Sequence, residues 1–243
     1  MSSFVIKLIA VTAMLLDHTR LVFPDTFPIG FRVIGRLAFP LFAYLIAEGF
    51  RKTRSRGRFL ARLLLFAVIS EPFFRLAFAD ALNVKTFGII SFSNIFFTMF
   101  LGGVAITAYR YVLDKRNVVF LALLPAAVCV FLGGYLGVDY NWIGVLFIFA
   151  LYAVKKTHTR LIVMAGMCLL IWLPVYMLIL SGFGDAVTHA HYAMIASTLL
   201  TVPIAACYNG KRGYRAKWFF YIFYPAHLAA LWGVAVFLIS SSG

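Results

Sequence analysis

Long apolar stretches recur along nearly the whole chain of 243 residues, and they constrain its fold more than any other feature. A helix needs about 20 mainly apolar residues to cross the hydrocarbon of a bilayer. Nine stretches meet or approach this length: 4–23, 30–49, 59–78, 88–108, 118–135, 140–154, 161–180, 190–207 and 218–239. With 63% hydrophobic and only 12% charged residues, the composition is that of a membrane protein.

Helix is favoured over strand throughout these stretches. A spanning sheet must close into a barrel and would alternate polar and apolar residues, which FLALLPAAVCVFL at 120–132 does not. The sequence therefore predicts an all-α, polytopic helical membrane protein with about nine transmembrane helices, folded as a single bundle over residues 1–243.

Basic residues lie between the apolar stretches in short clusters, which is typical of topology signals. Although the formal net charge is +14, this placement argues against a nucleic-acid partner. If the connections alternate between the two sides of the membrane, one side holds 17 of the 22 Lys and Arg residues. The positive-inside rule then predicts a cytoplasmic N-terminus and an external C-terminus. The external side keeps Arg20, Arg32, Arg36, Arg75 and Lys85, with Asp17, Asp25, Glu71, Asp80, Asp139 and Asp185.

Several polar residues lie well inside the predicted helices, where a charged group costs at least ~2.5 kcal/mol. At 1.5 Å of rise per residue, those on the first four helices fall ~4–7 Å to the external side of the midplane. His227, on the last helix, can reach the same level. We therefore predict one buried polar site with six catalytic candidates: His18, Asp17, Arg36, Glu71, Asn94 and His227.

Two of these candidates also have a structural interpretation. Glu71 and Arg75 lie one turn apart, at the spacing of a helical ion pair that closes the bundle. Asn94, with Ser91 and Ser93 beside it, suits hydrogen bonding between helices.

The neighbours Asp17 and His18 are harder to explain by packing. Successive helical side chains diverge by ~100°, so we expect Asp17 to hold Arg36 or another helix rather than His18. Arg32 and Arg36 share a face one turn apart and need an anion, such as Asp17, Glu71 or a substrate oxygen. Histidine suits proton transfer near neutral pH, and arginine can stabilise an oxygen that gains negative charge.

Two basic clusters are predicted on the cytoplasmic side, RKTRSRGR at 51–58 and NGKRGYRAK at 209–217. Such clusters serve topology and contact anionic lipid in many polytopic proteins. A coenzyme bearing phosphates would also bind there, and the candidate residues are Arg51, Lys52, Arg54, Arg56, Arg58, Lys211 and Arg212.

The three cysteines stand alone in apolar stretches. We predict that Cys129, Cys168 and Cys207 are buried structural thiols, and we expect no metal site.

Five segments, spread from near the first residue to near the last, carry a family resemblance: LLDH at 15–18, IGRLAFPLFAYLIAEGF at 34–50, ARLLLFAVISEPFF at 61–74, SNIFFTMFLGG at 93–103 and YNGKRGYRAKWFFYIFYPAHL at 208–228. They resemble the TraX family of bacterial membrane proteins, which is associated with N-terminal acetylation of conjugative pilin subunits. The resemblance implies a multi-pass protein of the bacterial cytoplasmic (inner) membrane that uses acetyl-CoA. It makes His18 and Arg36 the expected active-site pair and assigns no role to the other candidates.

The resulting hypothesis is an integral membrane acetyltransferase. It would transfer an acetyl group from cytoplasmic acetyl-CoA to an extracytoplasmic protein or carbohydrate, such as a pilin N-terminus or a glycan hydroxyl. His18 would act as general base or accept the acetyl group itself, and Arg36 would stabilise the oxyanion.

Two other classes of function stay open at this point. A small ion- or proton-coupled transporter would use the intramembrane charges as a relay, although the sequence shows no repeated half and no paired broken helices. A non-catalytic assembly protein of a pilus or secretion apparatus would not need His18. The acceptor and the oligomeric state do not follow from the sequence.

Overall fold

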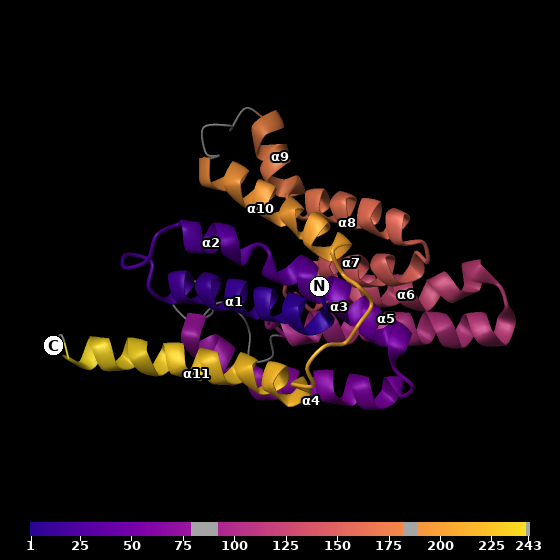
Figure 1. Cartoon of the computed structure of the whole chain (residues 1–243), viewed down its shortest axis with the longest axis horizontal. Helices are drawn as coiled ribbons and strands as arrows, with labels where there is room; N and C mark the ends of the chain where they lie inside the picture. The colour runs from indigo at the N-terminus through magenta and orange to yellow at the C-terminus, as the bar shows by residue number, and fades with distance from the viewer. Residues whose placement is uncertain (79–91, 182–188, 242–243) are drawn as a thin grey trace. The chain divides into compact units, whose positions relative to one another are not determined.

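The computed structural model describes residues 1–78, 92–181 and 189–241, which form helices (Figure 1). These three ranges contain no strand, so the predicted all-α class is confirmed for them. The helices are α1 (Ser3–Val22), α2 (Gly30–Gly35), α3 (Ala38–Lys52), α4 (Arg56–Phe78), α5 (Ile95–Arg116), α6 (Val119–Tyr135), α7 (Asn141–Ala153), α8 (Thr157–Ile171), α9 (Leu173–Leu180), α10 (His189–Ala206) and α11 (Lys217–Ser241).

Each predicted membrane stretch overlaps with one helix or with two consecutive helices. Within the described residues, three segments are long and apolar enough to span a bilayer: Gly30–Lys52, Ile95–Arg116 and Lys217–Leu238. The pair α8 and α9 is a fourth candidate. Every window of 18 residues in α1 or α4 contains at least three charged side chains, and α6 and α7 are shorter. These apolar helices support a multi-pass membrane protein, while the nine spans and their orientation stay predictions.

One predicted stretch is interrupted by a short turn and another is bent, and neither feature was predicted from the sequence. The stretch 30–49 divides between α2 and α3, with Pro40 in the first turn of α3. The stretch 161–180 bends by 53° between α8 and α9, with Pro174 in the first turn of α9. Proline fits a first turn because the N–H there has no intrahelical partner, and it disfavours helix in the preceding residue.

The fourth stretch is displaced along the sequence from its prediction. It was expected at 88–108, but α5 runs from Ile95 to Arg116, and residues 88–91 lie outside the described ranges. The helix continues beyond the apolar residues through Arg110 and Asp114, which pair one turn apart at 3.1 Å. It ends at Asn117, whose φ of 50° is left-handed.

The described residues pack as two compact units. The first unit contains residues 1–42, 73–78, 164–181 and 189–241, and the second contains 43–72 and 92–163. The single bundle over residues 1–243 stays a prediction. Three charges used for the predicted topology, Asp80, Lys85 and Asp185, lie outside the described residues.

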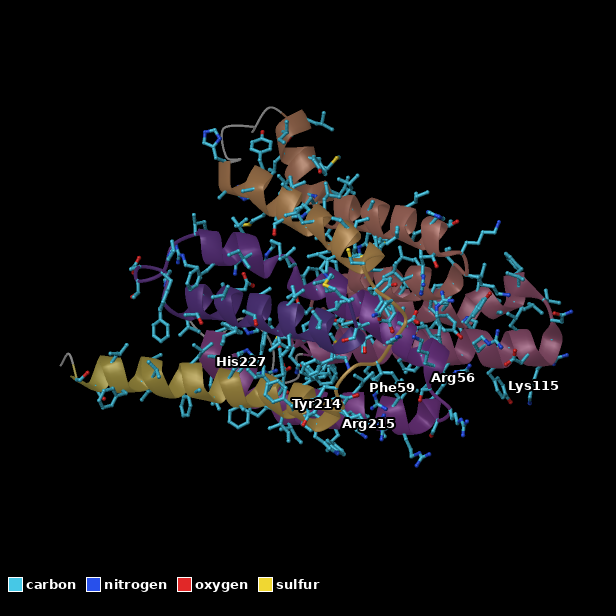
Figure 2. All side chains as sticks on the ribbon, viewed as in Figure 1. Arg56, Phe59, Lys115, Tyr214, Arg215 and His227 are labelled. Atoms are coloured by element: carbon cyan, nitrogen blue, oxygen red, sulfur yellow. The ribbon has the colours of Figure 1, made fainter. Side chains whose placement is uncertain are left out.

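In the first unit, α1 packs against α2 and α11. The backbone N–H groups of Ser3 and Phe4 donate to the carbonyls of Lys211 and Arg212, at 2.9 and 3.1 Å. Figure 1 shows α1 and α11 running in the same direction from this shared start, and Figure 2 labels Tyr214 and Arg215 on the segment that leads into α11. The two helices that carry His18 and His227 are therefore joined at one end.

In the second unit, α5, α6 and α7 pack against one another. A side-chain carbon at Gly102 would lie 2.8 Å from Ile148, so glycine lets α5 approach α7 closely. The hydroxyl of Thr98 donates to the carbonyl of Asp139 at 2.5 Å and fixes the turn before α7 to α5.

Candidate active site

Asp17 on α1 is the centre of a charged cluster in the first unit. Its two carboxylate oxygens accept hydrogen bonds from Nη2 of Arg36, at 2.7 and 2.5 Å. Nε of Arg32 lies 3.5 Å from the same carboxylate. The predicted contact between Asp17 and Arg36 is confirmed, and Asp17 is also the anion that the two arginines on one helical face require.

Gly35 permits this cluster to form. It is buried on α2 between the two arginines, and a Cβ at this position would overlap the side chain of Asp17. Only glycine leaves room for the carboxylate beside the backbone of α2. This role of Gly35 was not predicted, although a glycine next to Arg36 was the available signal in the sequence.

His18, the next residue on α1, contacts His227 on α11. Figure 2 labels His227 on that helix. Nδ1 of His18 lies 2.7 Å from Nε2 of His227, and the planes of the two rings differ by 12°. Nδ1 of His227 lies 2.8 Å from the carbonyl oxygen of Phe223, one turn earlier on α11. His227 is 6% exposed, whereas His18 is half-buried.

Aromatic side chains fix the orientation of both imidazoles. Phe78 and Tyr224 approach the His18 ring edge-on, with centroid distances of 5.0 and 6.1 Å. Phe223 stacks on His227 at 5.0 Å. Such contacts hold ring planes in place.

The first unit thus contains four of the six catalytic candidates, namely Asp17, His18, Arg36 and His227. His18 directly follows Asp17 on α1, so the histidine pair adjoins the charged cluster.

Glu71 and Asn94 meet in the second unit and hold α4 to the start of α5. Nδ2 of Asn94 donates to Oε2 of Glu71 at 2.6 Å and to the carbonyl of Ala67 at 2.8 Å. Oδ1 of Asn94 accepts the N–H of Phe96 at 3.0 Å and so caps α5. Glu71 also accepts the backbone N–H groups of Ser93 and Asn94, at 3.1 and 3.3 Å.

This network matches the interhelical hydrogen bonding considered for Asn94. The side chain of Asn94 is fully buried, and both of its polar atoms are bonded. Ser91, considered with it, lies outside the described residues. A catalytic role for Glu71 or Asn94 stays a prediction.

Arg51, the first residue of the basic cluster at 51–58, is committed to the backbone. Its Nη2 donates to the carbonyls of Leu151 at 2.9 Å and Tyr152 at 2.6 Å, and to that of Val154. These carbonyls are at the end of α7, which has no further helical N–H to bond them. Arg51 therefore caps α7.

Lys52 is also engaged, through an acid that the sequence analysis did not single out. Glu48 lies 2.9 Å from Nζ of Lys52 and 2.7 Å from Nη1 of Arg160. Arg160 is buried and lies over the ring of Tyr44. The signal for Glu48 was its position as the single acid in the apolar stretch 38–50.

The remaining phosphate-binding candidates are more accessible. Arg54 and Arg58 are exposed in the second unit, and Arg56, labelled in Figure 2, is half-buried. Lys211 and Arg212 are exposed in the first unit, on the segment that pairs with Ser3 and Phe4.

Cysteine burial was predicted correctly for two of three residues. Cys129 and Cys168 are buried, but Cys207 is exposed because it follows the last residue of α10. Within the described ranges, no group of three or more His, Cys, Asp or Glu side chains could hold a metal ion.

Comparisons with known proteins cover nearly the entire chain. The model of the family described as "TraX protein" matches residues 2–235. The curated protein "Probable fimbrial assembly protein FimC, serogroup H1" from Dichelobacter nodosus is 32% identical over 251 residues, which cover 98% of this chain and 97% of that protein. No solved structure matches.

Proposed function

Because this chain belongs to the TraX family, we propose that it is an integral membrane acetyltransferase of the bacterial cytoplasmic membrane. It transfers an acetyl group from cytoplasmic acetyl-CoA to an amine or hydroxyl on the external side. The association of the family with pilin acetylation makes a pilin N-terminus one candidate acceptor, and a glycan hydroxyl is the other.

The hydrogen bond between His18 and His227 carries this proposal. Two imidazoles that share a hydrogen bond at 2.7 Å, inside an aromatic enclosure, are suited to hold and move a proton. Beside them, the guanidinium groups of Arg32 and Arg36 contact the single carboxylate of Asp17. Two positive charges at one carboxylate support the proposal that Arg36 also stabilises an oxyanion.

In direct transfer, His18 removes the proton from the acceptor as its nitrogen or oxygen attacks the thioester carbonyl. Arg36 stabilises the negative charge that develops on the carbonyl oxygen. The C–S bond then breaks, and the CoA sulfur leaves with the proton held on His18. An acetylated acceptor and free CoA thiol are formed, and His18 returns to its starting state.

In two-step transfer, His18 itself attacks the thioester, releases CoA and carries the acetyl group to the acceptor. Rapid mixing with labelled acetyl-CoA in the absence of acceptor separates the two routes. Label on His18 supports two steps, and its absence supports direct transfer.

Acetyl-CoA is proposed to bind through exposed basic side chains. Arg54 and Arg58 of the second unit are one candidate set, and Lys211 and Arg212 of the first unit are a separate one. Each set has exposed guanidinium or ammonium groups that phosphates can reach. Arg51 and Lys52 contribute less to this proposal because they already bond the end of α7 and Glu48.

Purified protein in liposomes tests the proposal through the release of CoA thiol from acetyl-CoA with a peptide or glycan acceptor. His18→Ala is expected to lower the rate by about 10²-fold or more, as loss of a general base or nucleophile does. His158→Ala is the matched control, because His158 is exposed on α8, and it should retain the full rate. Equal rates for His18→Ala and the intact protein would contradict the proposal.

The relative from Dichelobacter nodosus is named as a probable fimbrial assembly protein, and this name favours a second candidate function, that of a non-catalytic assembly protein for surface fibres. It makes a different prediction in cells. If His18→Ala restores fibre assembly to a deletion strain as fully as the intact gene does, the assembly function does not use the proposed chemistry.

A further inference from the structure

The hydrogen bonds around His227 define which nitrogen of His18 carries a proton. They form a row: the carbonyl oxygen of Phe223, then Nδ1 and Nε2 of His227, then Nδ1 of His18. The two links are 2.8 and 2.7 Å long, within the range of ordinary hydrogen bonds.

A carbonyl oxygen can only accept a hydrogen bond, so the proton of this link is on Nδ1 of His227. A neutral imidazole has one N–H, which makes Nε2 of His227 the acceptor. The proton between the rings therefore belongs to Nδ1 of His18. It follows that Nε2 of neutral His18 has no proton and presents a lone pair.

Aromatic side chains around the two imidazoles oppose rotation of either ring, which would exchange the donor and acceptor nitrogens. His227 is buried and stacked on Phe223, and Tyr224 meets its ring edge-on at 5.5 Å. His18 is held between Phe78 and Tyr224 and is half-buried. The ring that would do chemistry is thus less enclosed than the ring that orients it.

We infer that His227 is a positioning residue, which uses the Phe223 carbonyl to hold His18 in the Nδ1–H tautomer and leaves Nε2 of His18 as the proton acceptor. This inference rests on the proposed function for its catalytic consequence, but not for the tautomer itself. In Ser-His-Asp enzymes an aspartate plays the corresponding part, and its loss presents the wrong tautomer to the reaction.

Two substitutions of His227 separate its two hydrogen bonds. In His227→Gln, the amide oxygen is as many bonds from Cα as Nε2 of histidine, so the acceptor for His18 is kept. In His227→Asn, the amide nitrogen replaces Nδ1, so the contact with the Phe223 carbonyl can persist while the acceptor for His18 is lost.

The tautomer can be measured by solid-state NMR of full-length protein with ¹⁵N,¹³C-histidine in liposomes, and His18 is assigned by comparison with His18→Asn. We expect the Nδ1–H form at His18 in the intact protein and in His227→Gln, and an Nε2–H form in His227→Asn. Nε2–H at His18 in the intact protein would overturn the inference, and this result needs no variant to fold. An unchanged tautomer in folded His227→Asn would also overturn it.

Kinetics provide the second readout. His227→Asn should lower kcat by about 10-fold or more with the KM for acetyl-CoA unchanged, whereas His227→Gln should stay within about threefold of the intact protein. If His227→Gln keeps the tautomer but is as slow as His227→Asn, His227 acts through its own proton and the positioning role is wrong. If His18→Ala leaves CoA release unchanged, the proposed function fails, while the NMR result still decides the tautomer.

Discussion

The cluster around Asp17 and His18 in the first unit and the cluster around Glu71 and Asn94 in the second both place a carboxylate in a network of polar groups. They differ in how their hydrogen-bonding capacity is used. Both polar atoms of the Asn94 side chain are bonded, and its bonds join α4 to the cap of α5. In the histidine pair, the bonds that fix one side of His18 leave its other ring nitrogen as an acceptor.

This difference separates a structural role from a catalytic one, although the sequence predicts that both groups of residues lie at the same depth in the membrane. A network whose partners are all within the fold contributes stability and order. A network that holds one side of an imidazole and leaves the other side accessible contributes chemistry, because a substrate can supply the missing partner. The following substitutions test that separation.

Asp17→Asn should have the largest effect on stability. It leaves two guanidinium groups without their carboxylate in a buried setting, and we expect a loss of about 3–5 kcal/mol in the free energy of unfolding. Asp114→Asn is the control, because its pair with Arg110 on α5 is exposed and contributes about 0.5 kcal/mol. Denaturant titration in detergent compares the two, and equal losses would show that the Asp17 cluster is no more than a surface pair.

Asn94→Ala should break the second cluster as a structural element. It leaves the Ala67 carbonyl, the Phe96 N–H and part of Glu71 without partners, at a cost of about 2–4 kcal/mol. Protein that remains folded should keep its rate of acetyl transfer. The exposed Asn209→Ala is the control, with about 0.5 kcal/mol. A large fall in rate at unchanged stability would instead make Asn94 part of the active site.

Gly35→Ala tests whether the close approach of α2 to α1 supports the active cluster. The added methyl group overlaps Asp17 and should cost about 1–3 kcal/mol in stability while displacing Arg36 and slowing transfer. Gly30→Ala, at the start of the same helix, meets nothing within 4 Å and should change neither property. Similar values for the two variants, by thermal unfolding and by CoA release, would contradict this reading of Gly35.

Arg54→Gln with Arg58→Gln should have the smallest effect. An exposed charge pair contributes about 0.2–1 kcal/mol, so the loss of each arginine should raise the KM for acetyl-CoA by up to about fivefold. High salt should make this rise smaller because it screens the charges. Arg116→Gln removes an exposed charge at the end of α5 and should leave the KM unchanged.

Arg51→Gln should lower the stability of the protein instead, since Arg51 caps α7. A larger rise in KM for Arg51→Gln than for Arg54→Gln would reverse this assignment.

Much of the fold could be predicted because long apolar stretches mark the positions of helices. Helices α1, α6 and α7 lie within one or two residues of the predicted stretches. The breaks before Pro40 and Pro174 were not predicted, since hydropathy averages over a stretch and is insensitive to backbone geometry. The end of α5 was missed because its last turns carry charged side chains, including the pair of Arg110 and Asp114, and apolar length does not predict them.

Part of the site could be predicted because two neighbouring positive charges require an anion nearby. Arg32 and Arg36 needed an anion, and Asp17 was among the three named for them. The contact between His18 and His227 could only be anticipated as a shared depth, because it depends on how α1 and α11 are aligned. Arg51 was misleading for a related reason: sequence distinguishes a basic cluster from its neighbours, but not a guanidinium that caps a helix from one that awaits a ligand.

The backbone pairing of Ser3 and Phe4 with Lys211 and Arg212 gives α1 and α11 a common origin. From there both helices run in one direction, so the meeting of two imidazoles far from that origin depends on the phase of each helix. One residue inserted into either helix would turn its histidine by about 100° and advance it by about 1.5 Å. Substitutions on the outer faces of these helices therefore leave this alignment in place, whereas a change in the number of residues between the paired segment and either histidine does not.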